Sequence, residues 1–227
     1  MSRVNLTPRL AATASLVVGG GTVVDIGTDH AYLPAYLIQS GKVNSAIAAD
    51  VRKSPLENAK ETVLKYNLQE KITLKLSDGL AEINKDEVDE IVFAGMGGTL
   101  IAEKLSECNW VKNEKLHFIF QPQSKAEDLR EYLYSNGFEI SQELAVSEGR
   151  RYYIAFDAVY TGKIKEFTLS DCFIGKLPKN EDAKMHLTNQ LNRLEKKYSA
   201  LKAKGENEAE IKELEILINN IKGFIYG

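Results

Sequence analysis

Five short apolar runs recur along the first half of the chain, with little polar alternation inside them. They cover residues 22–26, 45–49, 72–76, 90–94 and 116–120. Nearly continuous Val, Ile, Leu, Phe and Ala is typical of parallel strands that helices cover on both faces. Helical periodicity fills the segments between them, at residues 31–40, 55–66, 99–107 and 125–136, with a short helix expected from Leu80. Ser54 and Pro55 predict the N-cap and first position of the second of these helices. The alternation predicts right-handed βαβ units in a doubly wound α/β fold.

The pattern changes after residue 137. Residues 138–147 and 151–160 are two strand-like runs separated by Glu148-Gly149-Arg150, which predicts an antiparallel hairpin that closes one edge of the sheet. Residues 8–16 predict a short helix before the first strand, and residues 161–183 are expected to be irregular.

A third pattern begins at Leu187, where apolar residues recur at alternating spacings of four and three. They are Leu187, Leu191, Leu194, Tyr198 and Leu201 and, after a break at residues 204–207, Ile211, Leu214, Ile218 and Ile221. This heptad spacing predicts two amphipathic helices joined by a glycine-containing turn. We therefore predict two domains, residues 1–162 and residues 163–227.

Composition places few limits on this organisation. The chain of 227 residues, 44% hydrophobic and 27% charged, is ordinary for a globular protein with one sizeable domain and an appendage. A net charge of −3 does not indicate nucleic-acid binding by the whole chain, but residues 184–204 hold six cations and one acid: Lys184, Arg193, Lys196, Lys197, Lys202 and Lys204 against Glu195. Two distant cysteines, no secretory signal and no long apolar run lead us to expect a cytoplasmic protein without a membrane.

The first apolar run leads into Asp25-Ile26-Gly27-Thr28-Asp29-His30-Ala31. A small residue is needed where a strand turns tightly into a helix and a ligand approaches the backbone. Asp29 stands where a dinucleotide-binding turn has its second glycine, and its charge would repel a pyrophosphate. The amino group of the methionine tail of S-adenosyl-L-methionine would instead attract Asp29 or Asp25. The alternative is an ordinary strand–helix turn with Asp29 as the N-cap.

Two further acids follow the next two runs. Asp50 lies 23 residues after Gly27, where a carboxylate is placed to accept hydrogen bonds from ribose hydroxyls. Asp78-Gly79 follows the third run, and there Asp78 could bond an adenine amino group while Gly79 lets the backbone approach the ring. The alternatives are an ordinary strand end and an Asp-Gly turn.

The fourth run ends in Gly95-Met96-Gly97-Gly98. Three glycines in four residues are entropically costly, and they lie at the strand ends where doubly wound folds bind ligands. We interpret this segment as a loop over the reacting centre, the alternative being a flexible turn with Thr99 as N-cap. After the fifth run, Gln121 has the donor and acceptor needed to read a base edge, or to satisfy backbone groups in a loop.

One of the three histidines is a candidate site residue. His30 lies in the predicted site, whereas we interpret His117 as packing within a strand and His186 as opening a surface helix. The sequence has no Ser-His-Asp pattern, metal-ligand cluster or P-loop, so no metal is expected.

With these landmarks the chain resembles the TrmK family, bacterial tRNA (adenine-N1)-methyltransferases that modify the adenine at tRNA position 22. The matching stretches are Arg9-Leu10, residues 25–34 (DIGTDHAYLP), Asp78-Gly79-Leu80, residues 94–98 (AGMGG) and Gln121-Pro122. The chain departs from the family at Gln123, where asparagine is expected, and at residues 174–178, where a Gly-Pro pair is expected.

The resemblance implies a Rossmann-like class I methyltransferase domain followed by a coiled-coil-like helical hairpin that binds tRNA, in a protein expected to be a monomer. The implied S-adenosyl-L-methionine site comprises Asp25, Gly27, Asp29, His30, Asp50, Asp78, Gly79, Gly95, Met96 and Gly97. On the substrate side are Arg9, Tyr32, Gly98, Gln121, Pro122, Lys196 and Lys197. Asp29 is also the catalytic candidate, as a carboxylate beside the cationic methylated adenine, and Tyr32 would stack on the extruded base or pack in the core.

Two other functions stay open at this point. A nicotinamide-linked oxidoreductase uses a similar sheet, but such a sheet usually ends in another parallel strand, whereas the common methyltransferase sheet ends in an antiparallel pair. The second alternative is a non-catalytic RNA-binding protein whose helical hairpin is the active part.

Overall fold

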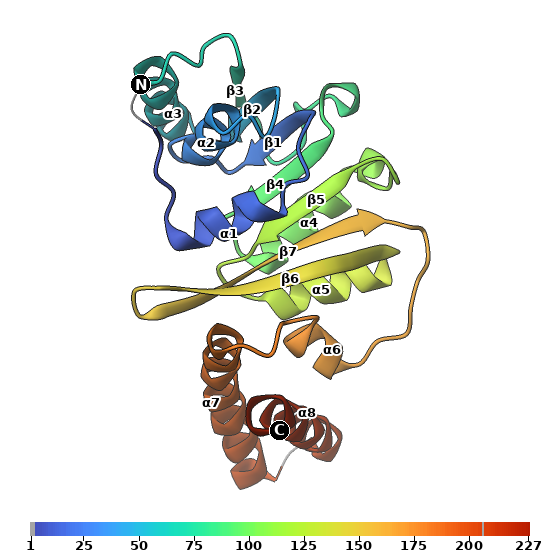
Figure 1. Ribbon diagram of the computed structural model, residues 1–227. Coiled ribbons are helices and arrows are strands. Elements are labelled where there is room, and N and C mark those ends of the chain that lie inside the picture. Colours follow the sequence, from blue (N-terminus) through green and yellow to red (C-terminus); the bar gives the residue numbers. More distant parts are fainter. Residues whose placement is uncertain (1–2, 206) are drawn as a thin grey trace.

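A seven-stranded sheet with the order β3-β2-β1-β4-β5-β7-β6 forms the centre of the protein (Figure 1). The computed structural model describes residues 3–205 and 207–227. Five strands are parallel: β1 (Thr22–Ile26), β2 (Ser45–Asp50), β3 (Ile72–Leu76), β4 (Glu90–Ala94) and β5 (His117–Gln121). β7 (Arg151–Tyr160) runs antiparallel between β5 and β6 (Phe138–Glu148). The predicted Rossmann-like sheet with a closing hairpin is confirmed.

Residues of the inner strands alternate between two apolar cores. Val24 and Ile26 of β1 face the core that contains α4 (Gly98–Ser106) and α5 (Ala126–Ser135). Val23 faces the other core, under α1 (Pro8–Leu16), α2 (Tyr32–Gln39) and α3 (Lys53–Lys65). Helices on both faces hold the strands in place, so the loops at the strand ends are carried by a rigid support.

The chain reverses direction across the sheet between β3 and β4. From β1 it proceeds to β2 and β3 on one side, then crosses back so that β4 pairs with the other edge of β1. At such a switch point the loops that follow the two neighbouring strands diverge and leave a crevice for ligands. The loops after β1 and β4 therefore mark the expected site.

Three local predictions were wrong. α3 begins at Lys53 with Arg52 as its N-cap, so Pro55 occupies its third position, where the missing N–H is still not needed. No helix begins at Leu80; that segment forms turns and leads to a short 3₁₀ helix, η1 (Lys85–Glu87). A second 3₁₀ turn, η2 (Asn109–Val111), precedes β5.

The third error is α6 (Leu169–Ile174), which lies in a segment expected to be irregular. Thr168 and Asp171 form a reciprocal capping box: the Thr168 hydroxyl accepts the Asp171 N–H at 3.2 Å, and the Asp171 carboxylate accepts the Thr168 N–H at 2.7 Å. Six residues are too few for a visible helical period, so the capping pair was the only local signal.

The C-terminal part forms the predicted pair of helices, α7 (Glu181–Lys204) and α8 (Glu208–Tyr226), which pack on each other. Six residues of the predicted seam are buried in the same apolar cluster: Leu187, Leu191 and Leu194 on α7, and Leu214, Ile218 and Ile221 on α8. Gly205 ends α7 with a φ of 67°; residue 206 in the predicted break lies outside the described residues. The seam is continuous with the apolar core beneath α5 and the β6–β7 hairpin. The domain boundary at residue 162 stays a prediction.

A buried ion pair joins the sheet to the segment that leads to α7. The guanidinium of Arg130 on α5 donates to both carboxylate oxygens of Glu143 on β6, at 3.0 and 2.6 Å, and to the Cys172 carbonyl at 2.7 Å. Lys176 N–H donates to the same carboxylate at 3.1 Å, and a Cβ on Gly175 would collide with both side chains. This pair fixes residues 172–176 against α5 and β6.

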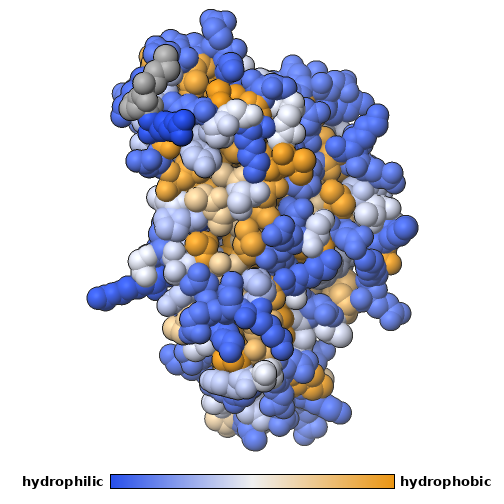
Figure 2. Space-filling model, in the orientation of Figure 1, coloured by the Kyte–Doolittle hydropathy of each residue, from blue (hydrophilic) through white to orange (hydrophobic). Residues whose placement is uncertain are grey.

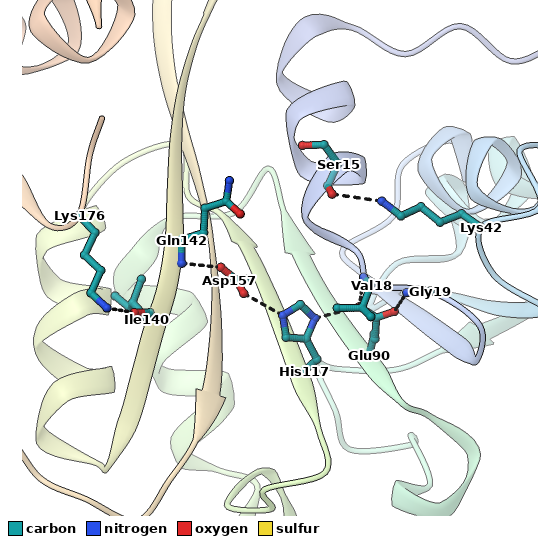
Figure 3. Close-up of polar contacts among 10 residues, drawn as sticks. All are labelled: Ser15, Val18, Gly19, Lys42, Glu90, His117, Ile140, Gln142, Asp157 and Lys176. Atoms are coloured by element: carbon teal, nitrogen blue, oxygen red, sulfur yellow. Dashed lines mark hydrogen bonds and ion pairs between the residues drawn. The ribbon is translucent and has the colours of Figure 1, made fainter. Parts of the chain in front are cut away.

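A cluster of Glu90, His117 and Asp157 lies at the opposite end of the sheet from the predicted site (Figure 3). His117 contacts Glu90 through Nδ1 and Asp157 through Nε2, each at 2.9 Å. The Glu90 carboxylate also accepts the N–H groups of Val18 and Gly19, at 2.8 and 2.7 Å. The interpretation of His117 as simple packing was therefore wrong: it bridges two carboxylates on neighbouring strands.

The protonation of His117 is expected to make stability depend on pH. Burial alone would lower the pKa of His117, but hydrogen bonds with Asp157 and Glu90 outweigh it and raise the pKa to about 9. The folded state holds this proton more tightly than the unfolded chain does. Protonated His117 therefore stabilises the fold fully below its ordinary pKa of 6.5, and this stabilisation is lost as pH rises through about 9. We expect the free energy of unfolding to fall by about 2–3 kcal/mol across that range, measured by urea denaturation. His117→Gln should be less stable at neutral pH and lack this decline; an equal decline in both proteins would contradict the assignment.

Candidate active site

A cavity of about 600 Å³ opens at the carboxyl ends of β1 and β4. Its walls come from five parts of the chain: the start of α1 (Thr7, Arg9, Leu10), β1 and the turn after it (Asp25, Gly27–Leu33), Arg52 after β2, the end of β4 and its loop (Ala94, Gly95), and the loop after β5 (Gln123). We call it the donor cavity. Its position is the switch point of the sheet, as the sequence predicts.

The turn after β1 shapes one wall of the donor cavity. Gly27 has a φ of 78°, and a Cβ there would lie 3.1 Å from the Met96 sulfur. The N–H groups of Gly27 and Thr28 both donate to the Ala49 carbonyl at 2.9 Å, which ties the turn to β2. The Thr28 hydroxyl is buried and has no hydrogen-bond partner among the described residues. An orphaned buried hydroxyl beside a cavity fits a polar ligand that would complete its hydrogen bonding.

Asp29 does not cap α2. The N-cap is Ala31, in the left-handed region with a φ of 51°. The side chain of Asp29 is 71% exposed at the cavity wall, and its carboxylate lies 3.4 Å from Nε2 of His30. The His30 ring stacks on Tyr32, with centroids 5.1 Å apart and planes 9° from parallel. Tyr32 is 43% exposed, so it does not pack in the core but presents a ring with His30 near the opening.

Two carboxylates near the ends of β1 and β2 are buried: Asp25 lines the donor cavity, whereas Asp50 does not. Burial raises the pKa of Asp25 to about 6; the nearby Thr28 hydroxyl, which approaches this carboxylate without reaching good hydrogen-bond geometry, opposes the effect, and the charge of Asp50 adds to it. Asp50 ends β2, where its carboxylate accepts the Arg52 N–H at 2.7 Å. Arg52 Nε is 3.5 Å from the same carboxylate. Arg52 lines the donor cavity and was missed in the sequence, although it stands two residues after Asp50.

Asp78 and Gly79 do not line the donor cavity. Asp78 is bound by the Lys104 ammonium at 3.0 Å and lines a separate pocket of about 330 Å³ beside Trp110. Gly79 has a φ of 58°, and a Cβ there would lie 2.8 Å from Lys104 Cδ. The close approach of Lys104 explains this glycine without a ligand, so an adenine contact by Asp78 stays a prediction.

The glycine loop after β4 runs beside the loop after β5. Gly95 N–H donates to the Gln121 carbonyl at 3.1 Å, Gln123 N–H to the Met96 carbonyl at 2.9 Å, and Gly98 N–H to the Ser124 carbonyl at 2.7 Å. Gly97 is the N-cap of α4, and the Thr99 hydroxyl instead donates to Asp128 at 2.7 Å. Gly95 faces the donor cavity. Gly98 is buried and does not line the cavity. The Lys125 carbonyl lies so close to it that a Cβ at this position would collide.

Arg9 connects α1 to the opposite wall. Its Nη1 donates to Gln121 Oε1 at 3.0 Å, its N–H donates to Glu148 at 3.1 Å, and its guanidinium lies 6.0 Å from the Tyr153 ring. Gln121 is completely buried, and its amide group is 3.4 Å from the Pro122 carbonyl. Gln121 therefore holds Arg9 in this structure, and Arg9 Nη1 and Gln123 Nε2 both lie against Gly95, within 4 Å of the position that a Cβ would take there.

Lys196 and Lys197 lie on α7 and do not line the donor cavity. Lys197 forms an ion pair with Glu210 of α8 at 2.8 Å. His186 was expected on the surface, but it lies half-buried against β7, within 3.4 Å of the Tyr152 carbonyl. Burial lowers its pKa, so its ring is neutral near pH 7.

Comparison with known proteins shows to which family this chain belongs. Residues 6–156 match a family described as a methyltransferase domain. The tRNA (adenine(22)-N(1))-methyltransferase of Bacillus subtilis is 31% identical over 98% of this chain and 96% of its own length. This chain belongs to the tRNA (adenine(22)-N1)-methyltransferase (TrmK) family. The predicted resemblance is confirmed, and the nicotinamide-linked alternative is excluded.

Solved TrmK-type structures extend the match to the whole fold. Streptococcus pneumoniae Sp1610 in complex with S-adenosyl-L-methionine has a TM-score of 0.81 and 32% identity, covering 96% of this chain and 98% of that one. M. capricolum TrmK in complex with S-adenosyl-homocysteine has a TM-score of 0.79 and 28% identity, covering 97% of both chains. The C-terminal helical pair is therefore part of the shared fold.

Two observations bear on partners of this TrmK-family chain. Over residues 3–205 and 207–227, no group of three His, Cys, Asp or Glu side chains is placed to hold a metal ion. None of the helices in the described chain is both long and apolar enough to cross a membrane.

Proposed function

We propose that this protein methylates N1 of the adenine at position 22 of tRNA, with S-adenosyl-L-methionine as the methyl donor. The observation that carries the proposal is the match to a tRNA (adenine(22)-N(1))-methyltransferase over 98% of the chain, helical pair included. The tRNA substrate leads us to propose further that the protein works in the cytoplasm.

The donor cavity fits the proposed donor. Bound there, S-adenosyl-L-methionine supplies an electrophilic sulfonium methyl group. Asp50 would accept hydrogen bonds from the ribose hydroxyls, because a carboxylate after the second strand is placed for them. Asp25 or Asp29 would meet the ammonium of the methionine tail, and the orphaned Thr28 hydroxyl would gain a partner. Gly27 leaves space for the donor where a Cβ would already approach Met96.

Methylation of a ring nitrogen needs no general base to remove a proton before the attack. N1 of adenine has an in-plane lone pair, so attack on the methyl group depends mainly on positioning and on exclusion of water. The product carries a positive charge, which a nearby carboxylate stabilises. Asp29 is our candidate, since its carboxylate is at the cavity wall beside the exposed His30–Tyr32 stack.

The target base must leave the RNA stack before reaction. N1 lies on the Watson–Crick edge and is inaccessible in paired RNA, so we propose that the adenine is extruded into the donor cavity. The stacked rings of His30 and Tyr32 would receive its face, and Arg9 and Gln123 would approach its edge from the other wall.

Asp29→Asn is expected to lower kcat about tenfold if Asp29 stabilises the cationic product, whereas a loss of donor affinity at unchanged kcat would assign Asp29 to the ammonium of the methionine tail. The substitution keeps the size and acceptor of the side chain but removes the charge beside the cationic product. The effect is modest because the carboxylate is largely exposed to solvent. Single-turnover methyl transfer and donor titration measure the two quantities, with Asp86→Asn on η1 as the exposed control. Wild-type turnover and donor affinity in Asp29→Asn would exclude the role.

The proposed function is tested with unmodified tRNA and isotopically labelled donor. Digestion to nucleosides should reveal labelled N1-methyladenosine, and a transcript with guanosine at position 22 should remain unlabelled. Donor binding without methyl transfer to any tRNA would instead favour the non-catalytic RNA-binding alternative.

A further inference from the structure

A second cavity, of about 300 Å³, lies beside the donor cavity. It is bounded by the loop after β5, the end of the β6–β7 hairpin and the first half of α7. α7 contributes His186, Asn189, Gln190 and Arg193, at spacings that place them on one helix face. Gln123 lines both cavities, so the two are direct neighbours. We call this cavity the basic groove.

The arrangement of the elements leaves the groove open to a large partner. The β6–β7 hairpin extends outward from the sheet, with α7 below it (Figure 1). The surface at this projection is strongly hydrophilic (Figure 2). A macromolecule that enters the donor cavity past Gln123 can therefore continue along the hairpin and α7.

Unpaired positive charge distinguishes this groove. Lys125, Arg150, Arg151 and Arg193 line it, and no aspartate or glutamate does. Among the described residues no carboxylate forms an ion pair with any of the three arginines, and Lys125 is 3.7 Å from its partner Glu127. Elsewhere on the helical pair, by contrast, Lys197 pairs with Glu210 at 2.8 Å and Lys222 with Glu195 at 2.7 Å. The groove therefore gathers four cations, three of them arginines without an acidic partner among the described residues, in a lining that contains no acid.

The chemistry of the lining fits a nucleic acid strand. A planar guanidinium binds phosphate oxygens through two donors at once, which makes arginine well suited to phosphodiesters. Tyr152 and Tyr153 add half-buried aromatic rings, and Asn189 and Gln190 add amide donors and acceptors. Alternating cations, rings and amides match the phosphates and bases of an RNA strand.

We propose that the basic groove binds the phosphodiester backbone of tRNA at the nucleotides next to the extruded adenine. This inference rests on the proposed function, and it names where the substrate is held. Because the groove and the donor cavity share Gln123, phosphates fixed in the groove set the position from which the base enters. The main phosphate contacts then come from the hairpin and the first half of α7, and not from Lys196 and Lys197.

The test replaces two groove arginines on different elements. Arg151→Gln/Arg193→Gln should raise KM for tRNA at least tenfold at moderate salt, with kcat and donor affinity unchanged. Each lost phosphate contact lowers the slope of log(kcat/KM) against log salt by about 0.7–0.9, so the pair should lower it by about 1.5. Arg151→Lys/Arg193→Lys keeps the charges and should retain most of the salt slope. The matched control is Lys60→Gln/Lys71→Gln, which removes two exposed charges from the far edge of the sheet.

The outcomes separate this inference from the proposed function. Failure of the wild-type protein to methylate tRNA would overturn the function. Active wild-type protein together with an unchanged KM and salt slope in Arg151→Gln/Arg193→Gln would overturn the groove alone. Arg150→Gln, on the exposed turn of the hairpin, repeats the test without disturbing α7 and should lower the slope by about 0.7–0.9.

Discussion

Glu143→Ala is expected to lower the free energy of unfolding by about 3–5 kcal/mol. The substitution leaves the Arg130 guanidinium buried without its counter-charge, after the loss of hydrogen bonds of 3.0 and 2.6 Å. It also removes the acceptor of the Lys176 N–H. Removing one partner of a buried pair costs far more than the pair itself contributes, because the remaining charge stays out of water. Equilibrium urea denaturation at constant pH measures the change.

Two further variants show whether burial is the cause. Glu139→Ala breaks a surface pair with Lys165, 2.8 Å long, and should destabilise the protein far less than Glu143→Ala does. Arg130→Met/Glu143→Leu removes both buried charges and should be less destabilised than Glu143→Ala alone. If Glu143→Ala lowered the free energy of unfolding no more than Glu139→Ala does, the Arg130–Glu143 pair would not be effectively buried.

The same pair has a consequence for substrate binding. It holds residues 172–176 against α5 and β6, and α7 begins five residues later. The position of α7 beside the hairpin, and thus the shape of the basic groove, depends on this anchor. Variants that weaken the anchor without unfolding the protein should therefore raise KM for tRNA more than they change donor affinity.

The sheet could be predicted from the sequence because its signals are local. β1, β3, β4 and β7 begin and end where their apolar runs do, and the turn at Gly149 joins the two strands of the hairpin. The capping residue of α3 was misplaced because Ser54-Pro55 is a strong local signal, but the helix begins one residue before it. Local sequence propensity predicts that a helix or strand is present more reliably than it predicts the residues at which that element begins and ends.

The part of the candidate site that comes from a single sequence motif could be predicted. Gly27, Asp29 and His30 come from one turn, and the structure places all three around the same cavity as Asp25 and Gly95. The predicted site residues that do not line this cavity have neighbours that are distant in sequence. Gly98 is small because the backbone of residues 124–125 lies against it, and Asp78 is occupied by Lys104.

His117 is the clearest case of a distant cause. Its ring lies inside an apolar run, which is why packing was the natural interpretation. Its partners Glu90 and Asp157 are 27 and 40 residues away and meet it only because β4, β5 and β7 are neighbours in the sheet. Arg150 and Arg151 likewise join Arg193 only through the packing of the hairpin on α7.

Asp50→Ala is expected to weaken binding of S-adenosyl-L-methionine and of S-adenosyl-homocysteine equally, by about 100-fold or more. Each hydrogen bond from a ribose hydroxyl to a charged, buried carboxylate contributes about 1.5–3 kcal/mol, and both molecules present the same ribose. kcat at saturating donor should change little, because the ribose is remote from the methyl group. Isothermal titration gives the two affinities, and methyl transfer at high donor concentration gives kcat.

Three controls make the result specific to the ribose. Asp86→Ala removes an exposed acid from η1 and should leave both affinities unchanged. Asp50→Asn keeps an acceptor for the Arg52 N–H and should lose less affinity than Asp50→Ala, because only the charge is removed. Loss of the Asp50 charge should also lower the pKa of Asp25, which that charge helps to raise, so the pH dependence of donor binding should shift to lower pH. Donor affinity within twofold of wild type in Asp50→Ala would place the ribose elsewhere in the cavity.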